Sequence, residues 1–310
     1  MVGRGPVSAR LVRCLWLAGA VAAVAACGSG SPSSAPTKLK VGTTTGVLVS
    51  AFGSAWTTDL SDNLLLRIDS AKPRVSGKAE IGARPYGLAT GAGSVWVASQ
   101  YANTLDRVDP QTLKVEAQIE VGYQTFAATF GAGSVWVSVE GDGAVVRVDP
   151  SRNEVVARID GFVDPNGLVY ADHALWVSDL QAGQVVRIDT RTNRITDRIA
   201  VPSADWITPG AGALWVSSEN NRVYRLDPQT GKVTGSVRVG KNPLASAWVG
   251  GELWVPNIDS NAISVIDPAT LKVTRTIRAG SAPLGVLSTA DAVLVTMSNA
   301  GSVWRFDTSG

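Results

Sequence analysis

The sequence predicts an all-β protein, a seven-bladed β-propeller with four strands in each blade. Two residue types mark a repeat of about forty residues, and the chain after residue 37 shows no helical periodicity. Tryptophan recurs at spacings of 40, 40, 40, 39 and 39, at Trp56, Trp96, Trp136, Trp176, Trp215 and Trp254, and Leu294 takes the seventh place. Aspartate runs in parallel, at Asp69, Asp109, Asp149, Asp189, Asp227, Asp267 and Asp307. Seven marks of each kind predict seven radial sheets.

The pattern of each unit predicts four short strands separated by turn residues. In the second unit the strands are expected over residues 87–90, 94–98, 104–109 and 114–121. Short runs rich in β-branched and aromatic residues, separated by Gly and Asp-Pro turns, are typical of hairpins. The unit is therefore a four-stranded meander.

The two ends of the repeat predict how the ring closes. Only three residues follow Asp307, so the seventh unit lacks its outer strand. Residues 38–42 precede the first unit and have the phase of an outer strand. We expect this segment to complete the last blade, because pairing removes an open sheet edge.

The N-terminus has the pattern of a secretory signal. Arg4, Arg10 and Arg13 precede an apolar run that ends at Ala26, and this run is too short to span a membrane. The segment Val24-Ala25-Ala26-Cys27 resembles the lipobox of bacterial lipoproteins, which implies cleavage before Cys27 and lipid on its sulfur. An ordinary signal peptide cut at this site is the alternative.

These patterns divide the chain into a signal peptide over residues 1–26, a lipidated Cys27 with a flexible tether over 27–37, and a propeller over 38–310. The expected location is outside the cytoplasm, anchored to the bacterial cell membrane. Cleavage removes three of the 28 Lys and Arg residues and leaves 26 acidic ones, so the formal charge becomes −1. A nucleic-acid partner is not expected at that charge, and we expect a monomer.

The repeated residues favour structural roles. Large rings in the middle of strands fill the space between sheets, and an aspartate at a strand end accepts backbone N–H groups of a turn. An arginine precedes this aspartate by two positions in six units, so the two side chains share a face and predict a charged ladder.

Two segments, Val146–Pro150 and Ile263–Thr270, resemble bacterial YVTN-type propellers and the streptogramin (virginiamycin B) lyase family. The resemblance implies the propeller fold and a metal-dependent lyase whose chemistry uses histidine. The chain has one histidine, His173, in a turn expected on the face away from the central funnel. The sequence therefore favours a protein without enzymatic activity.

Variation among the loops predicts the functional face. The loops that lead into each first strand (the lead-in loops) and those that follow each second strand meet on this face, and they carry aromatic and acidic residues. The candidate ligand-binding residues are Arg84, Tyr86, Phe126, Asn166, Asp179, Asp205, Trp206, Lys241, Asn257 and Asp259. We expect a small polar or cationic ligand or an envelope protein, with a divalent cation as a possible cofactor.

The sequence is compatible with three functions. The first is a lipid-anchored protein that binds a ligand or acts as a scaffold at the cell envelope. The second is a metal-dependent enzyme like the streptogramin lyases. The third is a purely structural envelope component.

Overall fold

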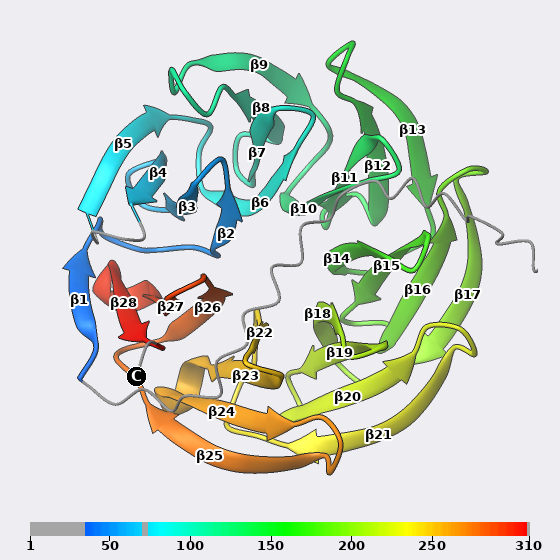
Figure 1. Ribbon diagram of the computed structural model, residues 1–310. Coiled ribbons are helices and arrows are strands. Elements are labelled where there is room, and N and C mark those ends of the chain that lie inside the picture. Colours follow the sequence, from blue (N-terminus) through cyan, green and yellow to red (C-terminus); the bar gives the residue numbers. More distant parts are fainter. Residues whose placement is uncertain (1–34, 70–73, 309–310) are drawn as a thin grey trace, which may run out of the picture.

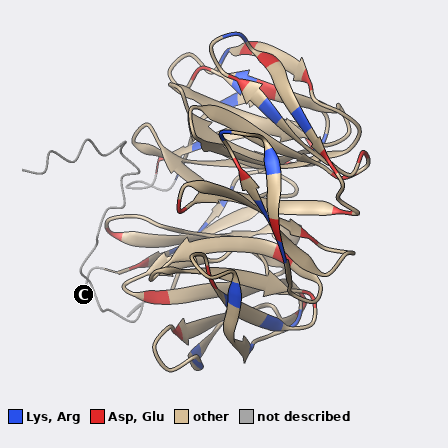
Figure 2. Ribbon diagram, turned by 90° about the vertical axis from the view of Figure 1, so that its right-hand side faces the viewer, with Lys and Arg blue, Asp and Glu red and all other residues tan. Residues whose placement is uncertain are grey.

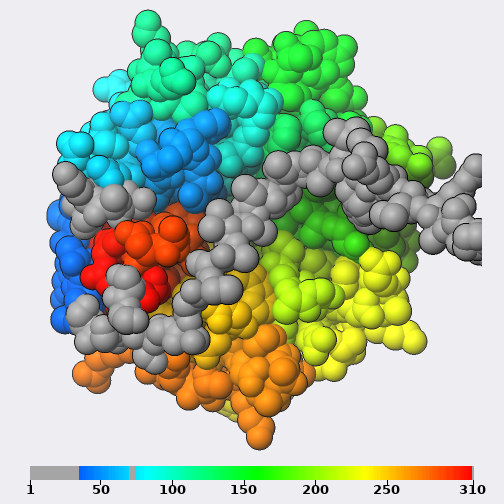
Figure 3. Space-filling view, viewed as in Figure 1, coloured from blue at the N-terminus to red at the C-terminus, as the bar shows by residue number. Residues whose placement is uncertain are grey.

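The computed structural model describes residues 35–69 and 74–308, so the predicted signal peptide and Cys27 lie outside the described residues. Seven four-stranded antiparallel sheets stand around a central axis (Figure 1). The predicted seven-bladed propeller is confirmed. In the space-filling view the blades form the sectors of a closed disc (Figure 3).

The blades follow one another in chain order, with the first strand innermost. Blade 1 contains β2 (Val49–Ala51), β3 (Ser54–Asp59), β4 (Leu64–Asp69) and β5 (Arg74–Glu80). Blade 2 contains β6 (Pro85–Gly91), β7 (Ser94–Ser99), β8 (Thr104–Val108) and β9 (Val115–Glu120). Blade 3 contains β10 (Thr125–Gly131), β11 (Ser134–Val139), β12 (Ala144–Asp149) and β13 (Glu154–Asp160). Blade 4 contains β14 (Pro165–Ala171), β15 (Ala174–Asp179), β16 (Gln184–Asp189) and β17 (Arg194–Ala200).

The remaining blades repeat this order with two short 3-10 helices. Blade 5 contains β18 (Ala204–Gly210), β19 (Ala213–Ser218), β20 (Arg222–Asp227) and β21 (Lys232–Arg238). Blade 6 contains β22 (Ala247–Val249), β23 (Glu252–Asn257), η1 (Ile258–Ser260), β24 (Ala262–Asp267) and β25 (Lys272–Arg278). Blade 7 contains β26 (Pro283–Ser288), β27 (Ala292–Met297), η2 (Ser298–Ala300) and β28 (Ser302–Asp307).

The N-terminal strand closes the ring as predicted. β1 (Thr37–Lys40) pairs antiparallel with β28, with Thr37 opposite Arg305 and Lys40 opposite Ser302. In Figure 1 the blue β1 lies outside the red β28. The first and last described segments thus share one sheet, which leaves no open edge on blade 7.

The tryptophan series builds the core between blades. All six indoles are buried, and five of them donate the ring N–H to a carbonyl at the end of the first strand, as Trp96 does to Gly91 at 3.0 Å. Leu294 is buried in the seventh place. A ring that is packed on both faces and hydrogen-bonded at its edge is a structural residue.

The aspartates cap the turns between third and fourth strands. Asp109, for example, accepts the backbone N–H groups of Gln111 and Thr112 at 3.0 and 2.6 Å. The hydrogen bonds from Thr112 hold the pKa of Asp109 below its usual value.

Three of the repeated arginines, Arg67, Arg107 and Arg147, join one blade to the next, which differs from the predicted ladder. In blade 7, Arg305 contacts Asp307 as the ladder predicted. Arg107 stacks on Trp96 of its own blade, 5.2 Å from the ring centre, and donates to Pro150 O of the following blade at 2.8 Å. Arg147 makes the equivalent bond to Thr190 O at 3.0 Å. The guanidinium group extends beyond the aspartate two positions later in its own blade. It can bridge two sheets because the arginine side chain is long and its planar end carries several N–H donors. Charged residues of both signs lie along the outer strands and turns (Figure 2).

No helix among the described residues is long and apolar enough to cross a membrane.

Candidate functional site

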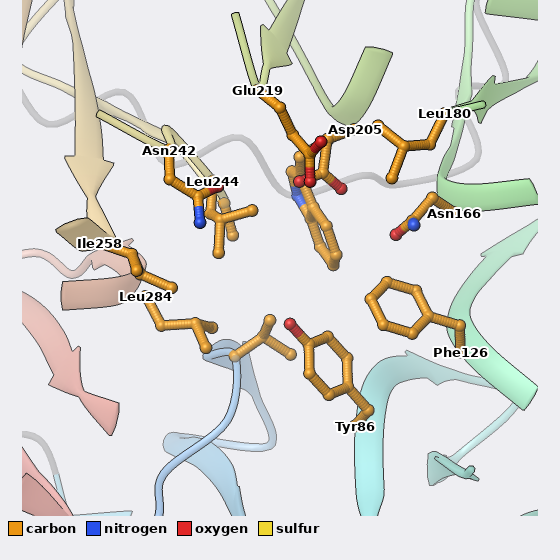
Figure 4. A pocket seen from close by; sticks show the side chains of 13 residues that line it. Tyr86, Phe126, Asn166, Leu180, Asp205, Glu219, Asn242, Leu244, Ile258 and Leu284 are labelled. Carbon is orange, nitrogen blue, oxygen red and sulfur yellow. The ribbon is translucent and has the colours of Figure 1, made fainter. Parts of the chain in front are cut away.

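A cavity of about 250 Å³ lies where the first strands of the blades converge (Figure 4). It opens on the face that carries the lead-in loops, and we call it the axial pocket. One side is polar and aromatic, lined by Tyr86, Phe126, Asn166, Leu180, Asp205, Trp206, Glu219 and Asn242. The other side is apolar, lined by Val47, Leu244, Ala245, Ile258 and Leu284.

A repeated backbone irregularity aims four of these side chains at the axis. Tyr86, Phe126, Asn166 and Asp205 are each the second residue of a first strand, in β6, β10, β14 and β18. The strand register shifts at this residue in all four blades. A bulge redirects the side chain out of the regular alternation, so four different groups meet in one place.

Serine hydroxyls fix the backbone of these residues from the preceding blade. Ser138 Oγ donates to Asn166 O at 2.7 Å, and Ser178 Oγ donates to the Asp205 carbonyl. Ser217 Oγ makes the same bond to Leu244 O at 2.9 Å. The inward residues of blades 4, 5 and 6 are therefore each held by a buried hydrogen bond that crosses between sheets, which leaves their side chains free for a ligand.

Two aromatic rings form one wall of the axial pocket. The rings of Tyr86 and Phe126 stack with centroids 4.2 Å apart and planes at 26°. The Tyr86 hydroxyl points toward the middle of the pocket (Figure 4). Burial, followed by the charges of Asp205 and Glu140, raises the pKa of Tyr86 well above its usual value. The hydroxyl therefore keeps its proton and can donate a hydrogen bond.

Asp205 is the most deeply placed charge of the axial pocket. The residue is 6% exposed, and none of the residues in 35–69 and 74–308 donates a hydrogen bond to its carboxylate. Burial, with the nearby charges of Glu219, Glu140 and Asp164, raises the pKa of Asp205 to about 7. A carboxyl group with this pKa exchanges a proton near neutral pH, as a general acid or base must.

Glu140 is a second carboxylate with a raised pKa, which burial and the charge of Asp164 move to about 7. Its Oε2 accepts a hydrogen bond from Gln100 Nε2 at 3.1 Å, and Gln100 Oε1 accepts one from Arg84 Nε at 2.9 Å. The chain of bonds from Arg84 through Gln100 holds the carboxylate in place without a direct ion pair.

Asn166 presents a buried acceptor that has no partner. The residue is 6% exposed, and its Oδ1 accepts no hydrogen bond from the described residues. Its side chain reaches into the axial pocket beside Phe126 (Figure 4). A buried acceptor without a donor is costly to the fold, so this oxygen is a good candidate to bind a ligand N–H group.

Trp206 follows Asp205 and contacts residues from opposite sides of the propeller. It packs against two apolar clusters, one containing Val47, Leu244 and Leu284 and the other containing Ala127 and Leu168. Blades 2 and 4 have glycine at the equivalent position. A Cβ on Gly87 would lie 2.5 Å from Phe126 O, and one on Gly167 would lie 2.6 Å from Asp205 O. Of blades 2, 4 and 5, only blade 5 therefore has room for a large side chain at this position. The Trp206 indole occupies it and contacts both sides of the axial pocket.

The structure brings together five of the residues chosen from sequence, namely Tyr86, Phe126, Asn166, Asp205 and Trp206. Arg84 lies next to them through its bond to Gln100 and stacks on Tyr101, 5.1 Å from the ring centre.

The other four chosen residues lie outside the lining of the axial pocket. Asp179 is fully buried and accepts the backbone N–H groups of Val163 and Asp164, which fixes a lead-in loop. Asn257 is fully buried, and its amide donates to Val255 O and Ala262 O, while its Oδ1 has no partner among the described residues. Lys241 and Asp259 are exposed in blade 6.

Glu140 and Glu219 were not among the chosen residues, although both lie in loops that the sequence marked as acidic. Each follows the last residue of a second strand, as Gln100, Leu180 and Ile258 also do. Aligning the seven units at this position isolates the two glutamates, since the other blades have amide, hydroxyl or apolar side chains there.

The predicted divalent cation has no evident ligand set in the described part of the chain. Among residues 35–69 and 74–308, no three His, Cys, Asp or Glu side chains gather closely enough to hold a metal ion. The carboxylates of the axial pocket raise one another's pKa values through their charges, but they are not arranged as ligands of one metal ion.

A protein-family model described as glutamine cyclotransferase matches residues 138–295. The chain belongs to the glutamine cyclotransferase family. The match runs from β11 to β27 and includes Glu140, Asn166, Asp205, Trp206 and Glu219. No curated protein sequence matches the chain.

Among solved structures, a chain of Kuenenia stuttgartiensis hydrazine synthase superposes with a TM-score of 0.71. The sequence identity is 13%, and the match covers 86% of this chain and 95% of that chain. At this identity the likeness concerns the propeller fold alone. The YVTN-type and streptogramin lyase resemblance stays a prediction.

Proposed function

We propose that the axial pocket binds a primary ammonium group and moves protons with Asp205 and Glu140, so that the protein cyclises an amino-terminal glutamine. The observation that carries this proposal is Asp205, a buried carboxylate with no donor from the described residues and a pKa of about 7. The name of the matching family supplies the reaction.

The reaction needs a base and an acid within reach of one substrate. The amino nitrogen attacks the carbon of the side-chain carboxamide, a C–N bond forms, and the carboxamide C–N bond breaks to release ammonia. A carboxylate first takes one proton from the bound ammonium group, because only the neutral amine has an electron pair with which to attack. The attacking nitrogen loses a second proton as the amide forms, and the departing nitrogen takes up one proton and leaves as ammonia. Carboxyl groups with pKa values near neutrality suit these transfers, because their charged and neutral forms are both populated at pH 7.

The remaining groups of the axial pocket suit a glutaminyl substrate. Asn166 Oδ1 can accept a hydrogen bond from the carboxamide NH₂ group, and the Tyr86 hydroxyl can donate to its oxygen. Stacked aromatic rings and carboxylates attract an ammonium group. The leucines on the opposite side offer an apolar surface for a methylene chain.

The proposal includes an extracytoplasmic location, with the protein anchored to the cell membrane by lipid on Cys27. The lipobox-like segment before Cys27 supports it. A Cys27→Ser variant should move from the membrane to the soluble fraction of the cell envelope.

The direct experiment incubates the purified mature protein with a peptide that begins with glutamine and follows ammonia release. The wild type should release ammonia, and Asp205→Asn and Glu140→Gln should each lose most of that activity. Glu154→Gln, an exposed change in β13, is the matched control and should retain it. Peptide binding without ammonia release would reduce the function to that of a ligand-binding protein, and the absence of both would refute the proposal.

A further inference from the structure

The direction of β1 determines on which face of the propeller the N-terminal segment arrives. β1 runs from Thr37 to Lys40, and the next residues form the lead-in loop of blade 1 on the face of the axial pocket. Val41 and Gly42 both donate their backbone N–H groups to Gly301 O there. Thr37, at the start of β1, therefore lies toward the other face. We call this the turn face, because the described turns between third and fourth strands lie on it.

The number of residues between Cys27 and the propeller limits where a lipid on Cys27 can be. The first described residue is Ala35, eight positions after Cys27. Eight residues span at most about 28 Å when fully extended. A six-residue strand such as β28 rises about 20 Å along the blade. The lipid would be level with the pocket face only if most of the intervening residues ran straight back along blade 7.

The turn face carries side chains that suit a lipid surface. Five of the outer strands begin with, or directly follow, an exposed basic residue on this face: Arg74, Lys114, Arg194, Lys232 and Lys272. The aspartates that end the third strands lie on the same face, and their carboxylates accept the N–H groups of the turns. Basic side chains are attracted to the surface of an anionic membrane.

The pocket face has a different character. Four carboxylates, those of Glu140, Asp164, Asp205 and Glu219, act on one another through their charges at its centre. An anionic lipid surface repels such a cluster. The same face exposes Tyr101, Tyr123 and Val163, and these are the side chains that would meet the lipid if the orientation were reversed.

We infer that the turn face lies against the membrane, so that the axial pocket opens away from the lipid toward the surrounding medium. The inference rests on the lipid anchor of the proposed function and adds the orientation of the propeller. A substrate then reaches the pocket from the side of the medium without passing between the protein and the membrane.

Two single-cysteine variants in blade 4 test this orientation. Ala182→Cys lies in the loop between β15 and β16 on the pocket face, and Thr192→Cys lies in the turn between β16 and β17 on the turn face. Both positions are exposed. The predicted cleavage removes Cys14 and lipid blocks the sulfur of Cys27, so each variant has one thiol for a fluorescent label.

The labelled, lipidated proteins are reconstituted into vesicles of phosphatidylglycerol and phosphatidylethanolamine that carry a quencher on the lipid headgroup. The label at position 192 should be strongly quenched, and the label at position 182 should keep most of its emission. Equal quenching of the two labels, or stronger quenching at position 182, would overturn the orientation and leave the anchor intact. A wild-type protein that does not bind the vesicles at all would overturn the anchor and the orientation together.

Discussion

The buried carboxylate of Asp205 predicts an unusual dependence of stability on pH. Its pKa is about 7 in the folded protein and 3.8 in an ordinary aspartate. The folded state thus binds the proton more tightly than the unfolded state, so the carboxyl group supports the fold fully below pH 4. This support is lost as the pH rises through 7. Asp205→Asn removes the charge and keeps the shape of the side chain.

The size of the effect follows from the pKa difference. At 1.36 kcal/mol per pKa unit, the difference between 3.8 and about 7 corresponds to about 4 kcal/mol at pH 9. Relaxation and coupling to Glu140 and Glu219 reduce this figure, so we expect Asp205→Asn to gain about 2–4 kcal/mol over the wild type at pH 9. At pH 4.5 the gain should shrink to about 1 kcal/mol, because the carboxyl group is then protonated in the folded protein and mostly ionised in the unfolded chain.

Urea unfolding of the wild type, Asp205→Asn and Glu154→Gln at pH 4.5 and 9 measures this directly. Glu154 is an exposed glutamate of β13, and its replacement should change the free energy of unfolding by less than about 0.5 kcal/mol at either pH. Equal stabilities of Asp205→Asn and the wild type at pH 9 would refute the reasoning. A gain of the same size at both pH values would also refute it, since the effect would then not come from the charge.

Three further predictions concern the axial pocket. Asn166→Leu removes a buried acceptor that has no partner in the described fold, so the free energy of unfolding should stay the same or rise by up to about 1 kcal/mol. The affinity for a glutaminyl peptide, measured by calorimetry, should fall about tenfold. An unchanged affinity would show that Asn166 does not contact the bound peptide. Ser178→Ala deletes the bond to Asp205 O, and Ser217→Ala deletes the contacts with Leu244 O and Ser246 Oγ of the next blade; each change should cost about 1 kcal/mol in urea unfolding. Only Ser178→Ala should lower ammonia release, because its bond holds Asp205, and equal activities would show that this backbone bond does not position the carboxylate. The rate of ammonia release should change most steeply near pH 7, where Asp205 and Glu140 titrate, and a rate that is flat between pH 5 and 9 would exclude both as the acid and base.

The fold could be predicted from sequence because its determinants are periodic. Trp96 and its equivalents recur at a constant spacing, and each fills the same gap between sheets. The closure by β1 followed from phase alone, since residues 38–42 stand at the same distance before Trp56 as the outer strands stand before later tryptophans. The arginine contacts could not be read in this way, because Arg107 bonds to Pro150 O, 43 residues later.

Asp179 and Asp205 show why the site was only partly predictable. Both are acidic residues of the funnel face, and the sequence offers no difference in kind between them. Asp179 ends β15, where the N–H groups of Val163 and Asp164 converge on its carboxylate. Asp205 sits at a register shift, where the described backbone offers no such donor. The difference depends on where backbone N–H groups point, which is a property of the folded chain.

The axial pocket is asymmetric although the ring around it is regular. The register shift recurs at the same place in blades 2, 3, 4 and 5, and a serine of the preceding blade bonds the inward residue in blades 4, 5 and 6. The backbone therefore presents one side chain per blade to the axis, whatever that side chain is. In blades 2 to 5 it is Tyr86, Phe126, Asn166 and Asp205, and in blades 6 and 7 it is Leu244 and Leu284. A substitution at one of these positions alters the pocket with little change to the framework, because the bonds that position the residue involve only its backbone. Chemistry can thus be confined to four adjacent blades of a ring whose stability depends on all seven.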